Sequence, residues 1–167
     1  MLDELPDHVR SMRRYAYVLC RDHHDADDLV QESLAKAIAA AHSFQEGRDL
    51  RVWLFSILHN TFVSSKRQYA QRTRAAAFLD AMTDDQLSTP EQEKRVEARH
   101  TVRMLSRLSP DQQAALSLIA IEGLSYDEAA KVLGIPVGTL MSRLARGREQ
   151  LRRLLNDKPP NRLKIVR

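Results

Sequence analysis

The sequence predicts an all-α protein made of two small helical domains. It has only five glycines and six prolines in 167 residues and is rich in Ala, Leu, Arg, Glu and Gln, which favour helices. Apolar residues recur at three-, four- and seven-residue steps, the spacing of helices with one buried face. An acidic stretch at 80–93, with five acids and no Lys or Arg, interrupts this pattern. We therefore predict domains at 1–75 and 93–158, a flexible linker at 76–92 and a basic tail at 159–167.

Two helices are predicted in the first part of this chain. The first begins near Pro6 and ends near Cys20, because its apolar residues have helical spacing. Asp25 is the expected cap of the second, which extends to His42. The second helix should bury Leu29 or Val30, Leu34, Ala37, Ile38 and Ala41. It should expose Asp28, Gln31, Glu32 and Ala35.

A glycine-containing loop separates this second helix from a long third one. Within residues 43–49, Gly47 supplies the turn and Asp49 is the expected cap. The third helix should run from about Leu50 into the seventies. Its apolar side consists of Trp53, Leu54, Ile57, Leu58, Thr61 and Phe62.

The second domain begins after the linker, in which a short helical turn is expected at 78–82. A helix is expected over 91–108. Ser109, Pro110 and Gln112 then combine a cap, a proline at the first helical position and a capping-box glutamine. A new helix should therefore begin at Pro110, and it should end at Gly123.

Residues 125–155 predict a helix-turn-helix. Ser125 and Glu128 form a capping box that begins one helix, and Gly134 offers the left-handed conformation that ends it. Pro136 suits the first turn of the next helix. The second helix should bury Val137, Leu140, Leu144, Leu151 and Leu155. It should turn Thr139, Ser142, Arg143, Arg146 and Arg153 outward. Five arginines against one acid in this helix favour a DNA-binding helix, although a helical hairpin with a solvated basic face is the alternative.

The charges of the chain are unevenly distributed. Residues 1–46 carry nine acids and five Lys or Arg, whereas residues 52–74 carry four Lys or Arg and no acid. This pattern favours a protein partner at one surface and nucleic acid at others, and a mixed solvated surface is the alternative. Five aromatic residues lie in or just before the basic stretch: Phe44, Trp53, Phe55, Phe62 and Tyr69. Aromatic faces beside positive charge suit unstacked bases, although Trp53 and Phe62 could simply fill a core.

Several classes of function have no support in this sequence. Cys20 is the only cysteine, so a small core residue is expected there rather than a disulfide or a zinc thiolate site. The acids and histidines at 23–28 fit a capped helix start better than a metal site. No phosphate loop or nucleophile motif is present, so we expect neither an enzyme nor a cofactor. An acidic N-terminus and the lack of a long apolar run favour a cytoplasmic protein without membrane insertion.

Three stretches of the chain resemble extracytoplasmic-function sigma factors, the smallest sigma factors of bacterial RNA polymerase. They are DADDLVQESLAKAI at 25–38, SFQEGRDLRVWLFSILHNTF at 43–62, and LSPDQQAALSLIAIEGLSYDEAAKVLGIPVGTLMSRLARGREQL at 108–151. The resemblance covers nearly the whole chain, from about Pro6 to Leu155, in the order of the family. The second stretch is especially similar to the general-stress branch. The resemblance implies that the two domains are sigma regions 2 and 4, and that an anti-sigma factor controls the protein.

The resemblance also implies three sets of binding residues. The helix that docks on the clamp of core RNA polymerase would contribute Asp28, Leu29, Gln31 and Glu32. The promoter minus-10 element would contact Phe44, Gly47, Arg48, Arg51, Trp53, Asn60, Lys66 and Arg67, and the loop at 44–51 would hold a flipped base. The minus-35 element would contact Thr139, Met141, Ser142, Arg143, Ala145 and Arg146. Met141 and Ala145 depart from the family, in which Lys or Arg and a larger residue are frequent at these positions.

Two other functions remain open from the sequence. One is a sigma-factor mimic that binds an anti-sigma protein but no promoter. The basic helix at 136–155 and the basic run at 66–74 argue against it, because a mimic does not need them. The other is a stand-alone helix-turn-helix regulator, which no evident dimerisation helix or ligand pocket supports. A nuclease has less support still, because no acidic metal cluster is present.

Overall fold

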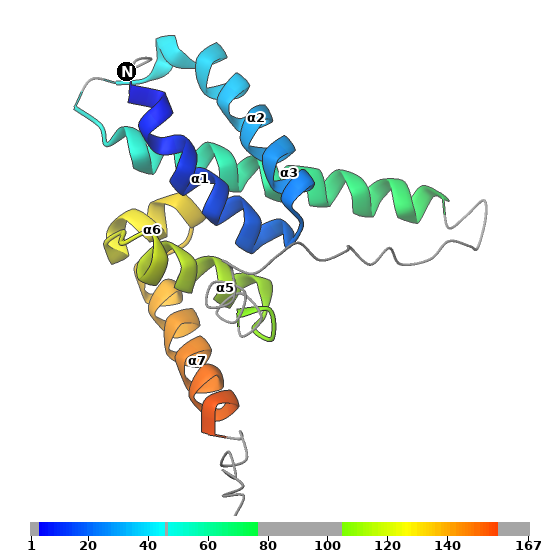
Figure 1. The fold of residues 1–167 in the computed structure, drawn as a ribbon, viewed down its shortest axis with the longest axis vertical. Helices are drawn as coiled ribbons and strands as arrows, with labels where there is room; N and C mark the ends of the chain where they lie inside the picture. Colours follow the sequence, from blue (N-terminus) through cyan, green and yellow to red (C-terminus); the bar gives the residue numbers. More distant parts are fainter. Residues whose placement is uncertain (1–3, 46, 77–104, 157–167) are drawn as a thin grey trace, which may run out of the picture.

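The first helical unit comprises α1 (Leu5–Cys20), α2 (His23–Ala39), the short 3₁₀ turn η2 (Ala41–Ser43) and α3 (Leu50–Ala76). The computed structural model describes residues 4–45, 47–76 and 105–156 (Figure 1). Helices α1 and α2 pack against each other, and α3 lies across both of them. Every regular element within the described ranges is helical, which confirms the all-α prediction.

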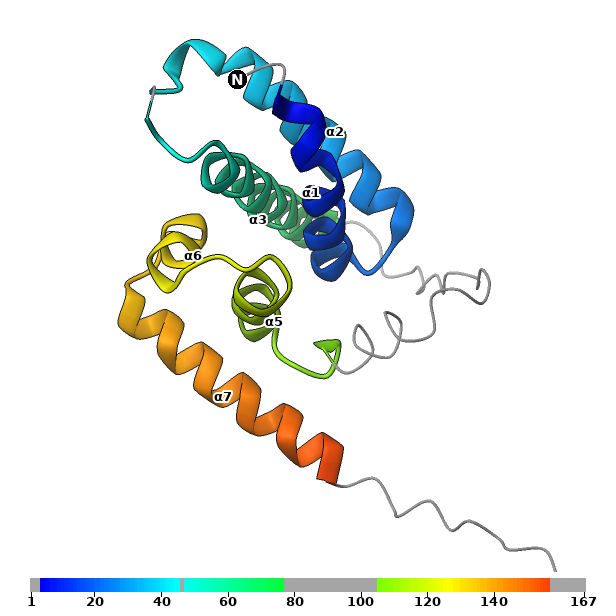
Figure 2. The same ribbon diagram turned by 60° about the vertical axis from the view of Figure 1, so that its left-hand side comes forward.

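The second helical unit comprises α5 (Pro110–Leu116), the π-helical turn η3 (Ser117–Ile121), α6 (Tyr126–Leu133) and α7 (Val137–Asn156). In Figure 2, α5 and α6 lie next to the first unit and α7 forms the outer edge. The turn after α6 has Gly134 at φ 62°, so α6 and α7 form the predicted helix-turn-helix. Ala130 is buried in α6, and its small side chain lets the neighbouring helix approach closely.

The two units pack against each other and share one hydrophobic core. The first unit contributes large buried side chains: Met12, Tyr15, Leu54, Phe55 and Leu58. The second contributes Leu118, Leu124, Leu140 and Leu144, among others. Contact between the units runs mainly along α3 and α6 and along α1 and α5 (Figure 2).

The predicted caps are present except the one assigned to α2. Ser109 and Ser125 both form complete capping boxes, and the Asp49 carboxylate accepts the backbone N–H groups of Arg51 and Val52. For α2, the cap is Asp22 and not Asp25, because the Asp22 side chain accepts the Asp25 backbone N–H at 2.9 Å. Helix α2 therefore begins three residues earlier than a cap at Asp25 would place it, at His23.

Two apolar residues predicted to be buried are exposed. Ile38 is 55% exposed, because the buried stripe of α2 is centred on Ala26, Val30, Ser33 and Ala37. Ser33 is tolerated there because its hydroxyl donates to the Leu29 carbonyl at 2.6 Å. Leu155 is 53% exposed, because the last turns of α7 extend beyond α5 (Figure 2).

The helical turn predicted at 78–82, the helix predicted over 91–108, the linker at 76–92 and the tail at 159–167 lie mostly or wholly outside the described residues. Their boundaries, and those of the two domains, stay predictions. None of the described helices is long and apolar enough to cross a membrane.

Candidate functional site

The outer face of α2 presents the polar residues predicted from the sequence. Asp28, Gln31 and Glu32 are all exposed, and Glu32 forms an ion pair with Lys36 at 2.7 Å, one turn along the helix. Leu29 differs from them, because it is buried beneath this face. The face therefore offers carboxylates and an amide to a partner, with Leu29 supporting them from below.

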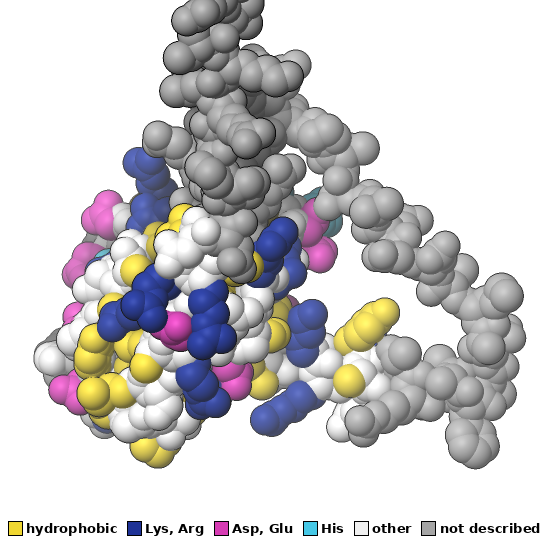
Figure 3. Space-filling view, turned by 90° about the horizontal axis from the view of Figure 1, so that it is seen from below, with side chains coloured by type: hydrophobic (Ala, Val, Ile, Leu, Met, Phe, Trp, Pro, Cys, Tyr) yellow, Lys and Arg dark blue, Asp and Glu magenta, His cyan; other side chains and the backbone are white. Residues whose placement is uncertain are grey.

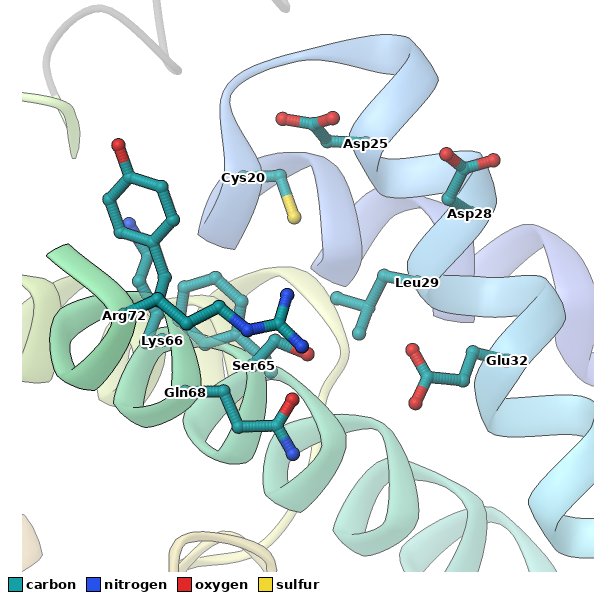
Figure 4. Close-up of a pocket in the computed structure, with 11 residues that line it drawn as sticks. Cys20, Asp25, Asp28, Leu29, Glu32, Ser65, Lys66, Gln68 and Arg72 are labelled. Carbon is teal, nitrogen blue, oxygen red and sulfur yellow. The ribbon is translucent and has the colours of Figure 1, made fainter. Parts of the chain in front are cut away.

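A groove of about 510 Å³ separates α2 from the second half of α3. Its α2 wall is acidic, and its α3 wall is basic (Figure 4). The acids are Asp25, Asp28 and Glu32, and the bases are Lys66 and Arg72. Sequence analysis identified both charged faces but not that they face each other, because that depends on how α2 and α3 pack.

Cys20 lines the same groove and is partly buried. Burial raises the pKa of its thiol to about 11, and Asp25 adds to the increase. At neutral pH this thiol stays protonated, and a thiol is a weak nucleophile in that form. The observation agrees with the predicted packing role of Cys20.

The loop before α3 is a tight turn stabilised at both ends. Gly47 has φ +90°, a conformation that residues with a side chain rarely adopt. At the start of the loop the Phe44 ring packs on the Trp53 ring, with centroids 5.1 Å apart. Both aromatic side chains are half-buried, whereas Gly47 and Arg48 are exposed. Phe44 and Trp53 thus fix the loop, and the glycine and arginine at its tip remain accessible.

Helix α3 carries the remaining residues predicted to contact the minus-10 element. Asn60, Lys66 and Arg67 are exposed along it. Lys66 lies 5.6 Å from the centre of the Phe62 ring, a distance at which cation–π attraction holds the ammonium group. Arg51 is different: its guanidinium lies 5.6 Å from the Phe55 ring and contacts Glu122 of the second helical unit.

Glu122 is the charged residue that sequence analysis missed. Its side chain is fully buried and pairs with Arg14 of α1, with 2.8 Å between Arg14 Nη2 and Glu122 Oε2. The hydrogen bond to Glu122 raises the pKa of Arg14. The sequence signal for Glu122 is that it is the single acid in the apolar run from Leu116 to Leu124. This signal does not indicate which arginines pair with it.

The exposed face of α7 is the predicted recognition face with one exception. Thr139, Met141, Ser142, Ala145 and Arg146 are all exposed. Met141 is 52% exposed, so its apolar side chain is accessible to a partner. Figure 3 shows Lys and Arg side chains spread over the lower face of the molecule, among neutral and apolar ones.

Arg143 is the exception, and its expected outward orientation alongside Arg146 is wrong. Its side chain is only 23% exposed and forms an ion pair with Asp111 at 3.0 Å. Arg143 directly precedes the buried Leu144, so it lies at the edge of the buried stripe, next to the first turn of α5. Arg146 instead stays at the surface, where its Nε donates to the Ser142 carbonyl.

The histidines and acids at the start of α2 have local roles in this structure. His24 lies 3.1 Å from Asp28 one turn later, and the Tyr17 and His23 rings stack with centroids 4.2 Å apart. Among the described residues, no group of three His, Cys, Asp or Glu side chains could hold a metal ion.

Comparison with known proteins identifies both helical units. Residues 5–59 match the family described as the sigma2 domain of PhyR, and residues 101–151 match the family described as sigma-70, region 4. These matches lie within the two predicted domains. The helix-turn-helix formed by α6 and α7 thus belongs to a sigma-70 region 4.

Individual relatives cover almost all of the chain. The ECF RNA polymerase sigma factor EcfG of Rhodopseudomonas palustris is 40% identical over 154 residues, which are 92% of this chain and 83% of the relative. The sigma factor RpoE of Bartonella quintana, solved in complex with the anti-sigma factor NepR, has a TM-score of 0.79 and 34% identity, covering 94% of this chain and 97% of RpoE.

A more distant structural match shows the fold alone. It is the anti-anti-sigma factor PhyR of Bartonella quintana in complex with NepR, with a TM-score of 0.57, 16% identity, and coverage of 92% of this chain and 49% of PhyR. The EcfG and RpoE matches are much closer and extend over both helical units. The chain therefore belongs to the family of ECF RNA polymerase sigma factors.

Proposed function

We propose that the chain is an alternative sigma factor of the general-stress branch, which binds core RNA polymerase and directs transcription from specific promoters. The observation that carries this proposal is the similarity to EcfG and RpoE across both helical units. In this function the chain is not an enzyme, because the polymerase supplies the chemistry. It acts in the cytoplasm, since the polymerase and the promoters are there.

The outer face of α2 is our candidate for the polymerase contact. Asp28, Gln31 and Glu32 are exposed on one side of a helix whose other side packs on α1 and α3. Leu29 supports the face from beneath. Acidic and amide groups in this arrangement suit a basic partner surface, for which charge complementarity gives specificity and fast association.

The loop before α3 and the exposed side of α3 are our candidates for the minus-10 contact. Gly47 and Arg48 are accessible at a loop tip that the pair of Phe44 and Trp53 holds in place. Such a fixed loop suits the capture of a base that has left the duplex. Asn60, Lys66, Arg67 and Arg51 would then contact the strand alongside the trapped base.

Helix α7 is our candidate for the minus-35 contact in the major groove. Thr139, Met141, Ser142 and Ala145 would face base edges, and Arg146 would face phosphates. Arg143, which is paired with Asp111, would contribute less. Met141 and Ala145 have apolar side chains and therefore favour contact with a thymine methyl group. Ser142 can hydrogen-bond to several bases, so it adds less discrimination.

An anti-sigma factor of the NepR kind is the regulator that we propose. RpoE, the solved relative with a TM-score of 0.79, is bound to NepR in its structure. The packed arrangement of the two helical units resembles the arrangement in that complex over 94% of this chain. Binding of such a regulator to these units would compete with core polymerase.

The second candidate function is a sigma-factor mimic. It has support from the match of residues 5–59 to the sigma2 domain of PhyR. A mimic would bind an anti-sigma factor but would not activate transcription. The exposed Lys66, Arg67 and Arg146 favour the sigma factor over the mimic, because they are suited to DNA contact.

Transcription with purified core polymerase separates the two candidates. The chain should bind core polymerase in a pull-down and should produce run-off transcripts from a set of genomic fragments. Gln31→Ala combined with Glu32→Lys should weaken core binding, whereas Asp7→Lys, at an exposed acid on α1, should not. Absence of both core binding and transcripts would favour the mimic, and equal affinity of both variants for core polymerase would contradict the α2 surface.

A further inference from the structure

A buried carboxylate joins the two helical units through a pair of arginines. Glu122 follows η3, and its side chain has no exposed surface. From α1, Arg14 donates through Nε to Glu122 Oε1 at 3.1 Å and through Nη2 to Oε2 at 2.8 Å. From α3, the Arg51 guanidinium donates to the Glu122 backbone carbonyl and lies 3.5 Å from Oε2.

The position of Glu122 depends on the irregular end of the helix that precedes it. The π-helical turn ends with the Glu122 N–H donating to the Ser117 carbonyl at 3.0 Å. Gly123 follows with φ +68°, and the Leu124 N–H donates a hydrogen bond to the Leu118 carbonyl. From this closed turn the carboxylate reaches Arg14 and Arg51 of the first unit.

Burial makes the carboxylate dependent on the arginines. A buried charge without a partner is strongly unfavourable, so Glu122 can remain inside only while the two units are together. If the units separate, the Glu122 carboxylate becomes hydrated, and Arg14 and Arg51 lose their contact with it at the same time. The ion pairs therefore exist only in the packed arrangement.

The same contact brings α6 next to one side of the loop assigned to the minus-10 element. A cavity of about 580 Å³ lies between this loop and α6. Arg48, Trp53 and Ser56 line it on one side, and Glu128 and Lys131 of α6 line it on the other. In the packed arrangement, α6 thus stands over one side of the loop while Glu122 holds Arg51.

We propose that Glu122 is an intramolecular competitor of promoter DNA for Arg51. This inference rests on the proposed function, in which Arg51 contacts the minus-10 strand. A carboxylate and a phosphate both accept hydrogen bonds from a guanidinium, so a single arginine cannot serve both fully. The packed arrangement fills the Arg51 site with Glu122, and separation of the units makes Arg51 available to DNA.

The proposal has a thermodynamic consequence for every residue that stabilises the packed form. DNA binds the separated form, so its apparent affinity falls with the fraction of molecules that are packed. Arg14 belongs to the packed form alone and is not among the residues assigned to DNA. Loss of Arg14 should therefore tighten DNA binding, even though a positive charge is removed.

Accessibility of the cavity tests whether Glu122 holds the units together. Ser56→Cys in a Cys20→Ser background places the chain's one thiol in the cavity beneath α6. Adding Arg14→Gln or Glu122→Gln should speed its reaction with an uncharged maleimide by about tenfold, the effect of one charge-assisted hydrogen bond on an equilibrium. Arg13→Gln is the control, because Arg13 pairs at 2.9 Å with Asp27 inside the first unit. Reaction rates equal to that of the control would overturn the proposal.

Affinity for DNA tests whether the released Arg51 is used. The full chain is titrated with a short fluorescein-labelled single-stranded DNA of mixed sequence at low salt. Arg14→Gln should bind it severalfold more tightly than the parent, whereas Arg13→Gln should bind more weakly, as its lost charge requires. Glu122→Gln should gain more affinity than Asp127→Asn, which removes an exposed acid of α6.

The two measurements distinguish the ways in which the proposal can fail. Weaker DNA binding by both arginine variants would overturn it, because charge alone explains that result. Faster thiol reaction without tighter DNA binding would also overturn it and would remove Arg51 from the DNA contacts. A wrong proposed function would show separately, as a parent chain that does not bind core polymerase.

Discussion

At the scale of single residues, the neighbours of a side chain decide its role more than its type does. Arg143 and Arg146 have the same chemistry and lie three residues apart, yet within the described ranges only Arg143 pairs with a carboxylate of another helix. Glycines show the same dependence. A methyl group added at Gly138 would meet no atom within 4 Å, whereas one added at Gly147 would lie 2.8 Å from the Leu116 side chain.

These two glycines give a matched prediction for stability. Gly138→Ala should raise the free energy of unfolding by up to about 1 kcal/mol, because alanine favours a helix more than glycine does. Gly147→Ala has the same advantage, but it should be outweighed by about 1–3 kcal/mol of overpacking against the buried Leu116. Urea denaturation of the full chain should show opposite signs for the two variants. Equal stabilisation by both would mean that α5 and α7 can separate without strain.

At the scale of helices, the sequence patterns predicted which helices form and where they end better than which side chains each helix buries. The caps at Ser109, Ser125 and Asp49 and the left-handed Gly134 were predictable, because each depends on residues within one turn. The exposure of Ile38 was not, since it depends on which neighbours cover the last turn of α2. The pairing of Arg143 likewise required knowledge of where α5 begins.

The two arginines of α7 should contribute differently to binding of minus-35 DNA. Arg146 is exposed and free of any carboxylate in the described structure, so Arg146→Ala should lower the slope of log affinity against log salt by about one. Arg143→Ala should lower it by less, because Asp111 already neutralises part of its charge. The measurement is a titration of the full chain with minus-35 duplexes at several salt concentrations.

A third variant serves as the control for this comparison. Asp111→Asn leaves Arg143 in place without its carboxylate partner, so the salt slope should rise towards a full contribution from Arg143. Equal reductions from the two arginine variants, with no effect of Asp111→Asn, would mean that the ion pair breaks on DNA at no cost. An unchanged slope for Arg146→Ala would place DNA on another face of α7.

At the scale of the whole molecule, the packing of the two units could not be predicted from the sequence. Periodicity and caps describe each helix separately, whereas contact between α3 and α6 depends on complementary shapes that are far apart in the chain. For the same reason, only those features of the candidate site that lie within one helix could be predicted. The shared exposed face of Gln31 and Glu32 follows from helical spacing, but Glu122 gains its ion pairs only through Arg14 and Arg51 of the other unit.

Packing of the units also partly buries a histidine between them. His59 of α3 lies with its Nδ1 3.0 Å from the buried Tyr15 hydroxyl, and it lines a cavity with Asp111 of α5 and Arg143 of α7. Burial lowers the pKa of His59 below its ordinary 6.5, and Arg143 acts in the same direction while Asp111 opposes them. The neutral imidazole is therefore the form that fits the folded chain.

The lowered pKa of His59 makes stability depend on pH. Above pH 6.5 the imidazole is neutral in both the folded and the unfolded chain, so the full contribution to stability is present. As the pH falls below 6.5, the unfolded chain takes up the proton more readily than the folded chain, and the free energy of unfolding decreases. His59→Gln should flatten this decrease, whereas His42→Gln, at an exposed position, should keep it. Urea denaturation at a series of pH values measures the slope, and a slope unchanged by His59→Gln would assign the acid sensitivity to another group.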